Sequence, residues 1–372
     1  MNWNNGPPWA KTRKSLGTIL LWGGGILFLN SAQIWGQTPS AAAAVSSQTR
    51  QDAQLRQDLK QTESLGGPKT IEEESVTARP LSPDMGDVQI MTQKEGKPWF
   101  FLTVDTQAFY NSNVLYASSV SSTFAAWQII TTPEIGFAPK IQDEQYSMFF
   151  PRGGFRYQFY TYAQAEPGPP PFNNAGISNN NFQVANPYGS LGWAFSEDLY
   201  LEFSVQANIY EGTGRNWSSW DNFLSEYPFA WQATWFKNFA EIQSVSVTAR
   251  TSYVLADPTN FSRTDNNLTF AWVTNPMREL NTQIYASFRL AKYTGLQPGT
   301  SPDTPPSEKQ FNNYDRLDIQ QTYGASVTWS PIEYLSLRAF VSWTKSDSTQ
   351  VEETGTFEAF NAGTGLNLIY RF

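Results

Sequence analysis

The chain has 372 residues, 15% of them aromatic, and a formal net charge of −8 at neutral pH. It contains neither cysteine nor histidine. This excludes a disulfide-stabilised scaffold, a thiol enzyme and a Cys-based metal site, and it removes the commonest general base and metal ligand. The acidic balance argues against a general nucleic-acid-binding protein. So many large rings are unusual in a chain with a mean hydropathy of −0.43, and they are typical of a surface that faces lipid.

Residues 1–36 have the layout of a secretory signal peptide. A basic segment from Lys11 to Lys14 precedes an apolar stretch over residues 16–29. That stretch has the length of a signal-peptide core and is short for a membrane-spanning helix. Gly36–Gln37 is a plausible cleavage point, and an uncleaved N-terminal anchor is the alternative.

Residues 37–96 differ in composition from both flanks. They are rich in Ala, Ser, Gln, Glu and Pro and poor in aromatic residues. Such a segment cannot bury enough apolar surface to fold alone, so we expect a disordered periplasmic spacer. A short polar helix that oligomerises, or a plug for the rest of the chain, is the alternative.

From residue 97 onward the sequence alternates between apolar and polar residues with period 2. In "LYLEFSVQANIY" the apolar residues run from Leu199 to Ile209 at every second position, and Glu202, Ser204 and Gln206 lie between them. Such alternation predicts β-strands that have one apolar and one polar face.

Counting these segments predicts about twelve strands, each long enough to cross a bilayer at a tilt. Short turns alternate with longer, partly Pro-rich connections, which is the pattern of periplasmic turns and outer loops. We therefore expect an all-β chain whose residues 97–372 form a single transmembrane antiparallel up-and-down β-barrel. The approximate strand spans are 98–111, 125–138, 148–162, 183–195, 199–211, 227–237, 242–256, 265–274, 281–294, 314–329, 334–345 and 357–372.

The last predicted strand ends in "GLNLIYRF", in which Leu366, Leu368, Tyr370 and Phe372 share one face. This ending resembles the terminal β-signal of bacterial outer-membrane β-barrels of porin-like type. In that class, a final Phe and apolar residues at two-residue steps are recognised by the barrel assembly machinery. The resemblance covers the last strand. It implies the assembly machinery and outer-membrane lipid as partners, and the outer membrane of a Gram-negative-type bacterium as the location.

A soluble β-sandwich would show the same alternation, because it also buries one face of each strand. Rings near both ends of the apolar faces favour the barrel, since they fit two interfacial girdles. The expected girdle residues are Phe100, Phe137, Phe195, Trp235 and Trp329 on the periplasmic side, and Trp127, Phe159, Phe229, Tyr253 and Trp343 on the outer side.

In a barrel, the polar faces of the strands line the lumen. If the charges there are unpaired, they can line a water-filled path, whereas paired charges can fill a narrow barrel. A small excess of arginine hints at anionic solutes. The candidate lumen or constriction residues are Arg156, Arg250, Arg289, Arg338, Asp105, Glu134, Glu202 and Asp318, with Arg316 and Arg371 as further cations.

Two functional hypotheses follow. The first is a porin-like channel for passive diffusion of small hydrophilic solutes. The second is a non-conducting barrel that acts as an anchor, adhesin or partner subunit through its outer loops. Ion pairing inside the barrel or a plug would favour the second. A homo-oligomer is possible on class analogy alone.

No catalytic residues, cofactor or metal site are expected. Hydrolase families of the outer membrane use a histidine, which this chain lacks. The acidic residues expected in outer loops have no metal-site spacing and are expected to be solvated; they are Asp221, Glu226, Asp303 and Glu308.

Overall fold

The computed structural model of the protein describes the strands and the shortest connections between them. The predicted signal peptide (1–36) and the segment 37–96 lie outside the described residues. Among the described residues, no helix is long and apolar enough to cross a membrane. The described residues are 99–114, 116, 125–139, 141–142, 148–164, 181–196, 198–212, 222–240, 242–277, 279–295, 315–332, 334–349 and 356–372.

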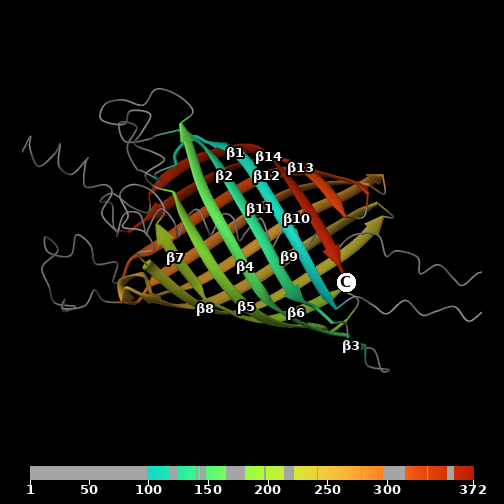
Figure 1. The fold of residues 1–372 in the computed structure, drawn as a ribbon, viewed down its shortest axis with the longest axis horizontal. Coiled ribbons are helices and arrows are strands. Elements are labelled where there is room, and N and C mark those ends of the chain that lie inside the picture. The colour runs from blue at the N-terminus through green and yellow to red at the C-terminus, as the bar shows by residue number, and fades with distance from the viewer. Residues whose placement is uncertain are drawn as a thin grey trace, which may run out of the picture.

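Strands dominate these ranges (Figure 1). A short 3₁₀ helix, η3 (Thr259–Phe261), lies between two of them. The strands are β1 (Phe100–Asn111), β2 (Ala126–Phe137), β3 (Ile141–Gln142), β4 (Met148–Gln164), β5 (Phe182–Ala194), β6 (Leu199–Gln206), β7 (Asn208–Gly212), β8 (Asn222–Ala240), β9 (Gln243–Asp257), β10 (Arg263–Met277), β11 (Leu280–Tyr293), β12 (Leu317–Ile332), β13 (Leu335–Ser348) and β14 (Phe357–Arg371).

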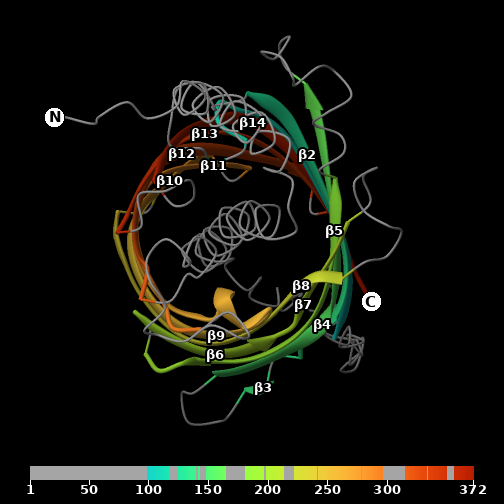
Figure 2. The same cartoon turned by 90° about the vertical axis from the view of Figure 1, so that its left-hand side faces the viewer.

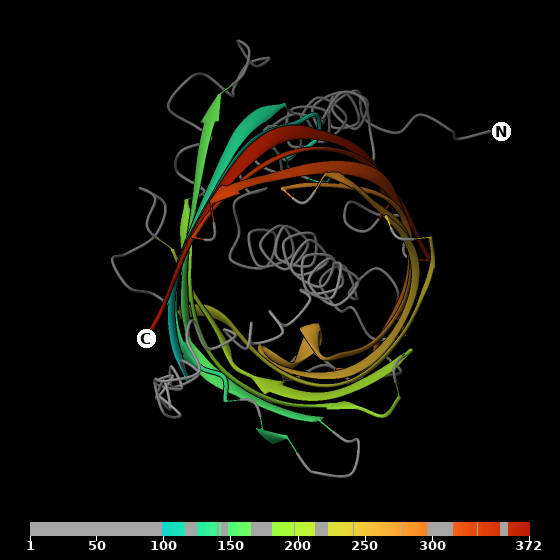
Figure 3. The same cartoon turned by 90° about the vertical axis from the view of Figure 1, so that its right-hand side faces the viewer.

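The sheet closes on itself, as the views along the barrel show (Figures 2 and 3). β14 pairs antiparallel with β1, from Phe101↔Arg371 to Asn111↔Asn361. β6 and β7 are two halves of one strand, interrupted at Ala207, and both pair with β5 and β8. The ring therefore has twelve crossing strands, and β3 is a short extra strand paired with β4. The predicted fold and all twelve predicted strands are confirmed.

The predicted start of the sixth strand was wrong, and the error concerns residues that face the lumen. β8 begins at Asn222 rather than near residue 227. Leu224 and Glu226 are therefore buried strand residues, whereas Glu226 was expected in a solvated loop. The sequence pattern did not extend the predicted strand this far, because Ser225 occupies a position of the outer face where the alternation requires an apolar residue.

The outer face of the barrel is a continuous apolar band. Trp127 and Ile129 of β2 are exposed, whereas Gln128 and Ile130, which alternate with them along the strand, are buried on the inner face. The predicted girdle rings lie on this band, and all but the half-buried Phe137 are among the exposed hydrophobic residues. A closed, even-stranded barrel with an apolar belt and aromatic girdles is built to cross a bilayer. The protein is a transmembrane β-barrel.

Closure of the barrel also involves the last residue, Phe372. The backbones of Phe100 and Phe372 exchange two hydrogen bonds, of 3.1 Å and 3.0 Å. Their rings stack at 6.0 Å between centroids. The terminal aromatic residue thus completes the seam between the first and last strands.

The inner face is less uniformly polar than the alternation predicted. Buried apolar and aromatic side chains gather at the outer ends of β1, β2, β4, β5, β7 and β8, where η3 also projects inside the ring (Figures 2 and 3). This part of the inner wall is packed rather than open. Its residues are Phe109, Val114, Ala126, Ile130, Tyr160, Tyr162, Phe182, Val184, Tyr210, Leu224, Ala256, Phe261 and Phe340.

A glycine of β14 makes one of these contacts possible. Gly363 faces Phe109 of β1 and Phe340 of β13, whose rings lie 5.7 Å apart. A Cβ atom added to Gly363 would collide with the Phe109 side chain and backbone. Gly363→Ala is therefore expected to lower the free energy of unfolding by about 1–3 kcal/mol, measured by urea titration of the refolded barrel.

Gly189 of β5 provides the matched control. A Cβ atom added there would lie 3.9 Å from its nearest neighbour, in ordinary contact. Gly189→Ala should leave the urea midpoint nearly unchanged. Equal midpoints for the two variants would contradict the packing described around Phe109.

Candidate functional site

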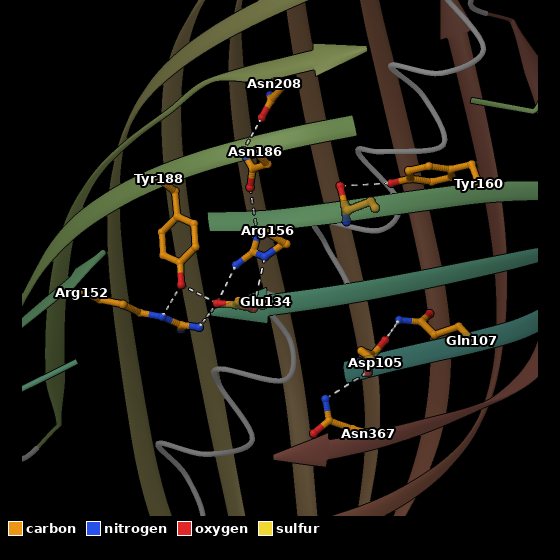
Figure 4. A network of polar contacts seen from close by, with 11 residues as sticks. Asp105, Gln107, Glu134, Arg152, Arg156, Tyr160, Asn186, Tyr188, Asn208 and Asn367 are labelled. Carbon is orange, nitrogen blue, oxygen red and sulfur yellow. Dashed lines mark hydrogen bonds and ion pairs between the residues drawn. The ribbon is translucent and has the colours of Figure 1, made fainter. Parts of the chain in front are cut away.

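The inner wall carries a compact ionic network on β2, β4 and β5 (Figure 4). Glu134 of β2 lies directly opposite Arg156 of β4 in the strand register. Arg156 Nε donates to Glu134 Oε2 at 3.2 Å, and Arg152 Nη2 donates to Glu134 Oε1 at 2.8 Å. Arg152 and Arg156 face inward together because they are four residues apart on one strand. One carboxylate therefore holds two guanidinium groups.

Tyr188 of β5 completes this network. Its hydroxyl donates to Glu134 Oε1 and accepts from Arg152 Nε at 3.3 Å. The Arg156 guanidinium carbon lies 4.7 Å from the centre of the Tyr188 ring, and that of Arg152 lies 5.1 Å from the centre of the Phe101 ring. These cation–π contacts favour one arrangement of the long arginine side chains. Glu134, Arg152, Arg156 and Tyr188 are called the Glu134 network below.

Two asparagines connect the Glu134 network to the strand interruption at Ala207. Arg156 Nη1 donates to Asn186 Oδ1 at 3.4 Å. The Asn186 amide donates to the carbonyl of Ala207 and to Asn208 Oδ1, both at 2.7 Å. A side chain thus supplies a hydrogen bond to a backbone carbonyl where the strand is broken, and a buried carbonyl needs such a partner.

Asp105 of β1 lies beyond Glu134, on the side of the Glu134 network opposite to Asn186 and Asn208 (Figure 4). Its carboxylate accepts from Gln107 at 2.8 Å and from Asn367 of β14 at 3.3 Å. Asp105 is therefore held by amides rather than by a cation in these contacts.

A second ionic network lies at the outer ends of β8, β10 and β11. Arg263 Nη1 donates to Glu226 Oε1 at 2.6 Å, and Arg263 Nε donates to Asp265 Oδ2 at 3.0 Å. Asp265 also accepts from Arg289 Nη2 at 2.6 Å. Glu226, Arg263, Asp265 and Arg289 are called the Arg263 network below. It balances two positive charges with two negative ones.

A bidentate pair continues this outer level. Arg316 donates to both carboxylate oxygens of Asp318, at 2.8 Å and 2.6 Å. The Arg316 guanidinium carbon lies 4.8 Å from the centre of the Tyr293 ring, and that of Arg263 lies 5.9 Å from the same ring. One buried tyrosine thus lies near two arginines, each of which also has its own acid.

The remaining predicted lumen residues lie on the inner wall away from these clusters. Glu202 of β6 accepts from the Tyr200 hydroxyl at 2.9 Å. Arg250 of β9 lies between Gln232 and Asn267 in the register. The guanidinium of Arg338 on β13 lies 5.4 Å from the centre of the Phe340 ring.

Of the eight predicted residues, Glu134 and Arg156 form an ion pair with each other. The structure adds residues that the sequence reasoning did not select, among them Arg152, Tyr188, Arg263 and Asp265. Arg152 could have been found, because it lies four residues before Arg156 within a predicted strand. Arg263 was missed because it precedes the predicted start of its strand.

A different lining covers β8 to β13. Small hydroxyl side chains face inward there and hydrogen-bond to one another across strands, for example Thr234 with Thr248 at 3.2 Å and Thr269 with Ser287 at 3.0 Å. We call this surface the hydroxyl wall. Its residues are Thr234, Ser244, Ser246, Thr248, Ser252, Thr269, Ser287, Thr322, Ser326, Ser342, Thr344 and Ser346.

No three acidic side chains within the described strands and turns gather in a geometry that could hold a metal ion.

Comparison with known proteins finds no matching family model and no matching curated protein. Among solved structures, the chain is similar to an outer-membrane channel from Pseudomonas putida F1, with 10% identity, 73% of this chain and 96% of that chain covered, and a TM-score of 0.48. It is also similar to the β domain of the Bordetella autotransporter BrkA, with 12% identity, 74% and 100% coverage and a TM-score of 0.41. A third structure is a bacterial polysaccharide outer membrane secretin, with 10% identity, 75% and 100% coverage and a TM-score of 0.38.

Proposed function

We propose that the protein is a porin-like channel for passive diffusion of small hydrophilic solutes across the outer membrane. The hydroxyl wall is the observation that supports this proposal best. It covers about half of the ring with short, uncharged, hydrogen-bonding side chains on β8 to β13. These side chains are buried in the structure, as are those of the apolar cluster, but they are short, can hydrogen-bond to water and leave more space than arginine or aromatic side chains would. Bulky and charged residues lie on β1 to β7 and at the outer end, and Arg250 of β9 and Arg338 of β13 interrupt the hydroxyl wall.

A second candidate is a non-conducting barrel that serves as an anchor, adhesin or partner subunit. Two observations favour it. Most of the inner-wall arginines in the described strands are ion-paired, as in Arg263 with Glu226 and Arg316 with Asp318. The apolar cluster around Phe109 and Tyr210 also packs part of the outer end. Both would be expected if side chains filled the barrel.

Conductance separates the two candidates. The refolded protein in a planar bilayer is expected to give steady ohmic steps, alongside a variant lacking residues 37–96. Steps from both proteins support a channel, and steps only from the shortened protein make residues 37–96 a plug. Silence from both, with folding shown by heat-modifiable gel migration, would leave the anchor or partner role.

We further propose that the barrel assembly machinery recognises the C-terminal residues during assembly. We also propose that the protein has no catalytic function. Leu366, Leu368, Tyr370 and Phe372 are all exposed on the outer face of β14 and at its end. They are therefore accessible to a partner that binds this strand before the barrel closes. The charged inner-wall residues have structural contacts that account for them without a reaction.

A further inference from the structure

The two ionic networks of the inner wall differ in their charge balance. Among the described residues, the Arg263 network pairs two arginines with two acids. The Glu134 network pairs two arginines with one acid. Its members therefore carry one positive charge in excess. Because the low-dielectric wall of a narrow pore focuses the electric field of the charges that line it, this excess acts on solutes more strongly than it would in bulk water.

The two networks also differ in access. The Arg263 side chain is 3% exposed and is enclosed by its partners. The Arg152 side chain is 37% exposed. Its Nε and Nη2 groups donate to Tyr188 and Glu134, and no described residue accepts from Nη1. A solute that enters the barrel can therefore meet a guanidinium edge.

The contacts within the Glu134 network indicate the kind of ligand that its arginines suit. Glu134 is held by Arg152, by Arg156 and by the Tyr188 hydroxyl, which are three donors converging on one carboxylate. Arginine edges suit carboxylates because their parallel N–H groups match the two oxygens. The Phe101 and Tyr188 rings hold the Arg152 guanidinium in place, so the side chain loses little conformational entropy when an anion binds.

We propose that Arg152, held by Tyr188 and Phe101, is the binding residue of an inner-wall subsite for carboxylate-bearing solutes. This inference rests on the proposed channel function and specifies its solute class. Glu134 tunes the site by neutralising one of the two arginines. A solute carboxylate binds at the exposed edge of Arg152 and passes on, because a single exposed pair in a wet lumen is weak.

Ion selectivity tests the subsite in the refolded full-length protein. In a KCl gradient, the wild type is expected to prefer chloride to potassium. Arg152→Gln should lower the permeability ratio of chloride to potassium by roughly three- to tenfold, the effect of one nearby charge at intermediate dielectric. Glu134→Gln should raise the ratio, because the second arginine is no longer neutralised.

Lys237→Gln is the matched control, since it also removes one positive charge but its side chain is 56% exposed, two residues from the exposed Trp235 on the outer face of β8. Its ratio should stay close to that of the wild type, because exposed charges are screened by salt. Equal shifts in Arg152→Gln and Lys237→Gln would overturn the proposal, as would a conducting wild type that prefers potassium.

Direct binding separates this inference from the channel function. Glucuronate, inorganic phosphate and glucose are titrated into the folded wild type and Arg152→Gln by calorimetry. The proposal expects weak glucuronate binding that is lost in the variant and no glucose binding. Equal binding of phosphate would make the subsite a general anion site and overturn the carboxylate assignment. Glucuronate binding to a silent barrel would keep the site and reject the channel, whereas no binding of glucuronate would reject the site.

Discussion

Arg263→Met is expected to lower the free energy of unfolding of the barrel by about 3–5 kcal/mol, which is the usual cost of removing one partner of a buried ion pair. Arg263 and Glu226 are 3% and 4% exposed at their side chains, and Asp265 is the second acid on Arg263. Without Arg263, Glu226 keeps the hydrogen bond that it accepts from the Tyr210 hydroxyl at 2.9 Å. An uncompensated carboxylate then lies buried in the wall, and the outer ends of β8 and β10 lose their link.

Urea titration followed by tryptophan fluorescence measures this effect. Lys237→Met is the control, because its pair with Asp198 has side chains that are 56% and 39% exposed and should contribute less than about 1 kcal/mol. Adding Glu226→Gln to Arg263→Met should recover part of the loss, since the orphaned charge disappears. A loss for Arg263→Met no larger than that for Lys237→Met would show that the Arg263 network does not stabilise the barrel.

Glu134→Ala is expected to lower the free energy of unfolding by about 3 kcal/mol, the lower end of the range for a buried pair. The effect is reduced because Arg152 is partly exposed, while Arg156 is only 14% exposed and loses its carboxylate. Two guanidinium groups then face each other across an empty space without the anion that separates them. The Tyr188 hydroxyl loses its acceptor as well.

Acetate gives this prediction a second readout. Because the variant leaves a carboxylate-sized space, acetate should raise its urea midpoint more than chloride at equal ionic strength, as a ligand that binds only the folded state does. Glu358→Ala is the control, since the Glu358 side chain is 61% exposed and 3.8 Å from Lys345. Identical responses of the two variants to acetate would contradict the account of the Glu134 network.

The strands were predictable because their alternation is a local property. A residue such as Leu201 or Phe203 needs only its neighbours in sequence to be assigned to a face. The same reasoning identified the girdle rings and the terminal strand. The break at Ala207 left no trace in the pattern, because β6 and β7 keep the same alternation on both sides of it.

The ion pairs were not predictable because they depend on the register between strands. Glu134 meets Arg156 only because β2 and β4 pair so that these residues oppose each other. A shift by two residues would give Glu134 a different partner and leave every side chain on the same face. The buried apolar cluster was missed for a related reason. Alternation assigns Phe109 and Tyr210 to the inner face or the outer face, but it does not reveal that inner-face rings from several strands meet.

The proposed channel requires that water fills the inside of the barrel while lipid covers the outside. The absence of native cysteine makes a direct test simple. Asn267 and Leu268 are neighbours on β10 that face opposite sides, and Asn267 contacts the hydroxyl wall through Ser287 at 2.8 Å. In lipid vesicles, Asn267→Cys should react with a charged, membrane-impermeant methanethiosulfonate reagent, and Leu268→Cys should not. Reaction of Leu268→Cys alone, or of neither variant, would contradict a wet lumen behind a lipid-facing wall.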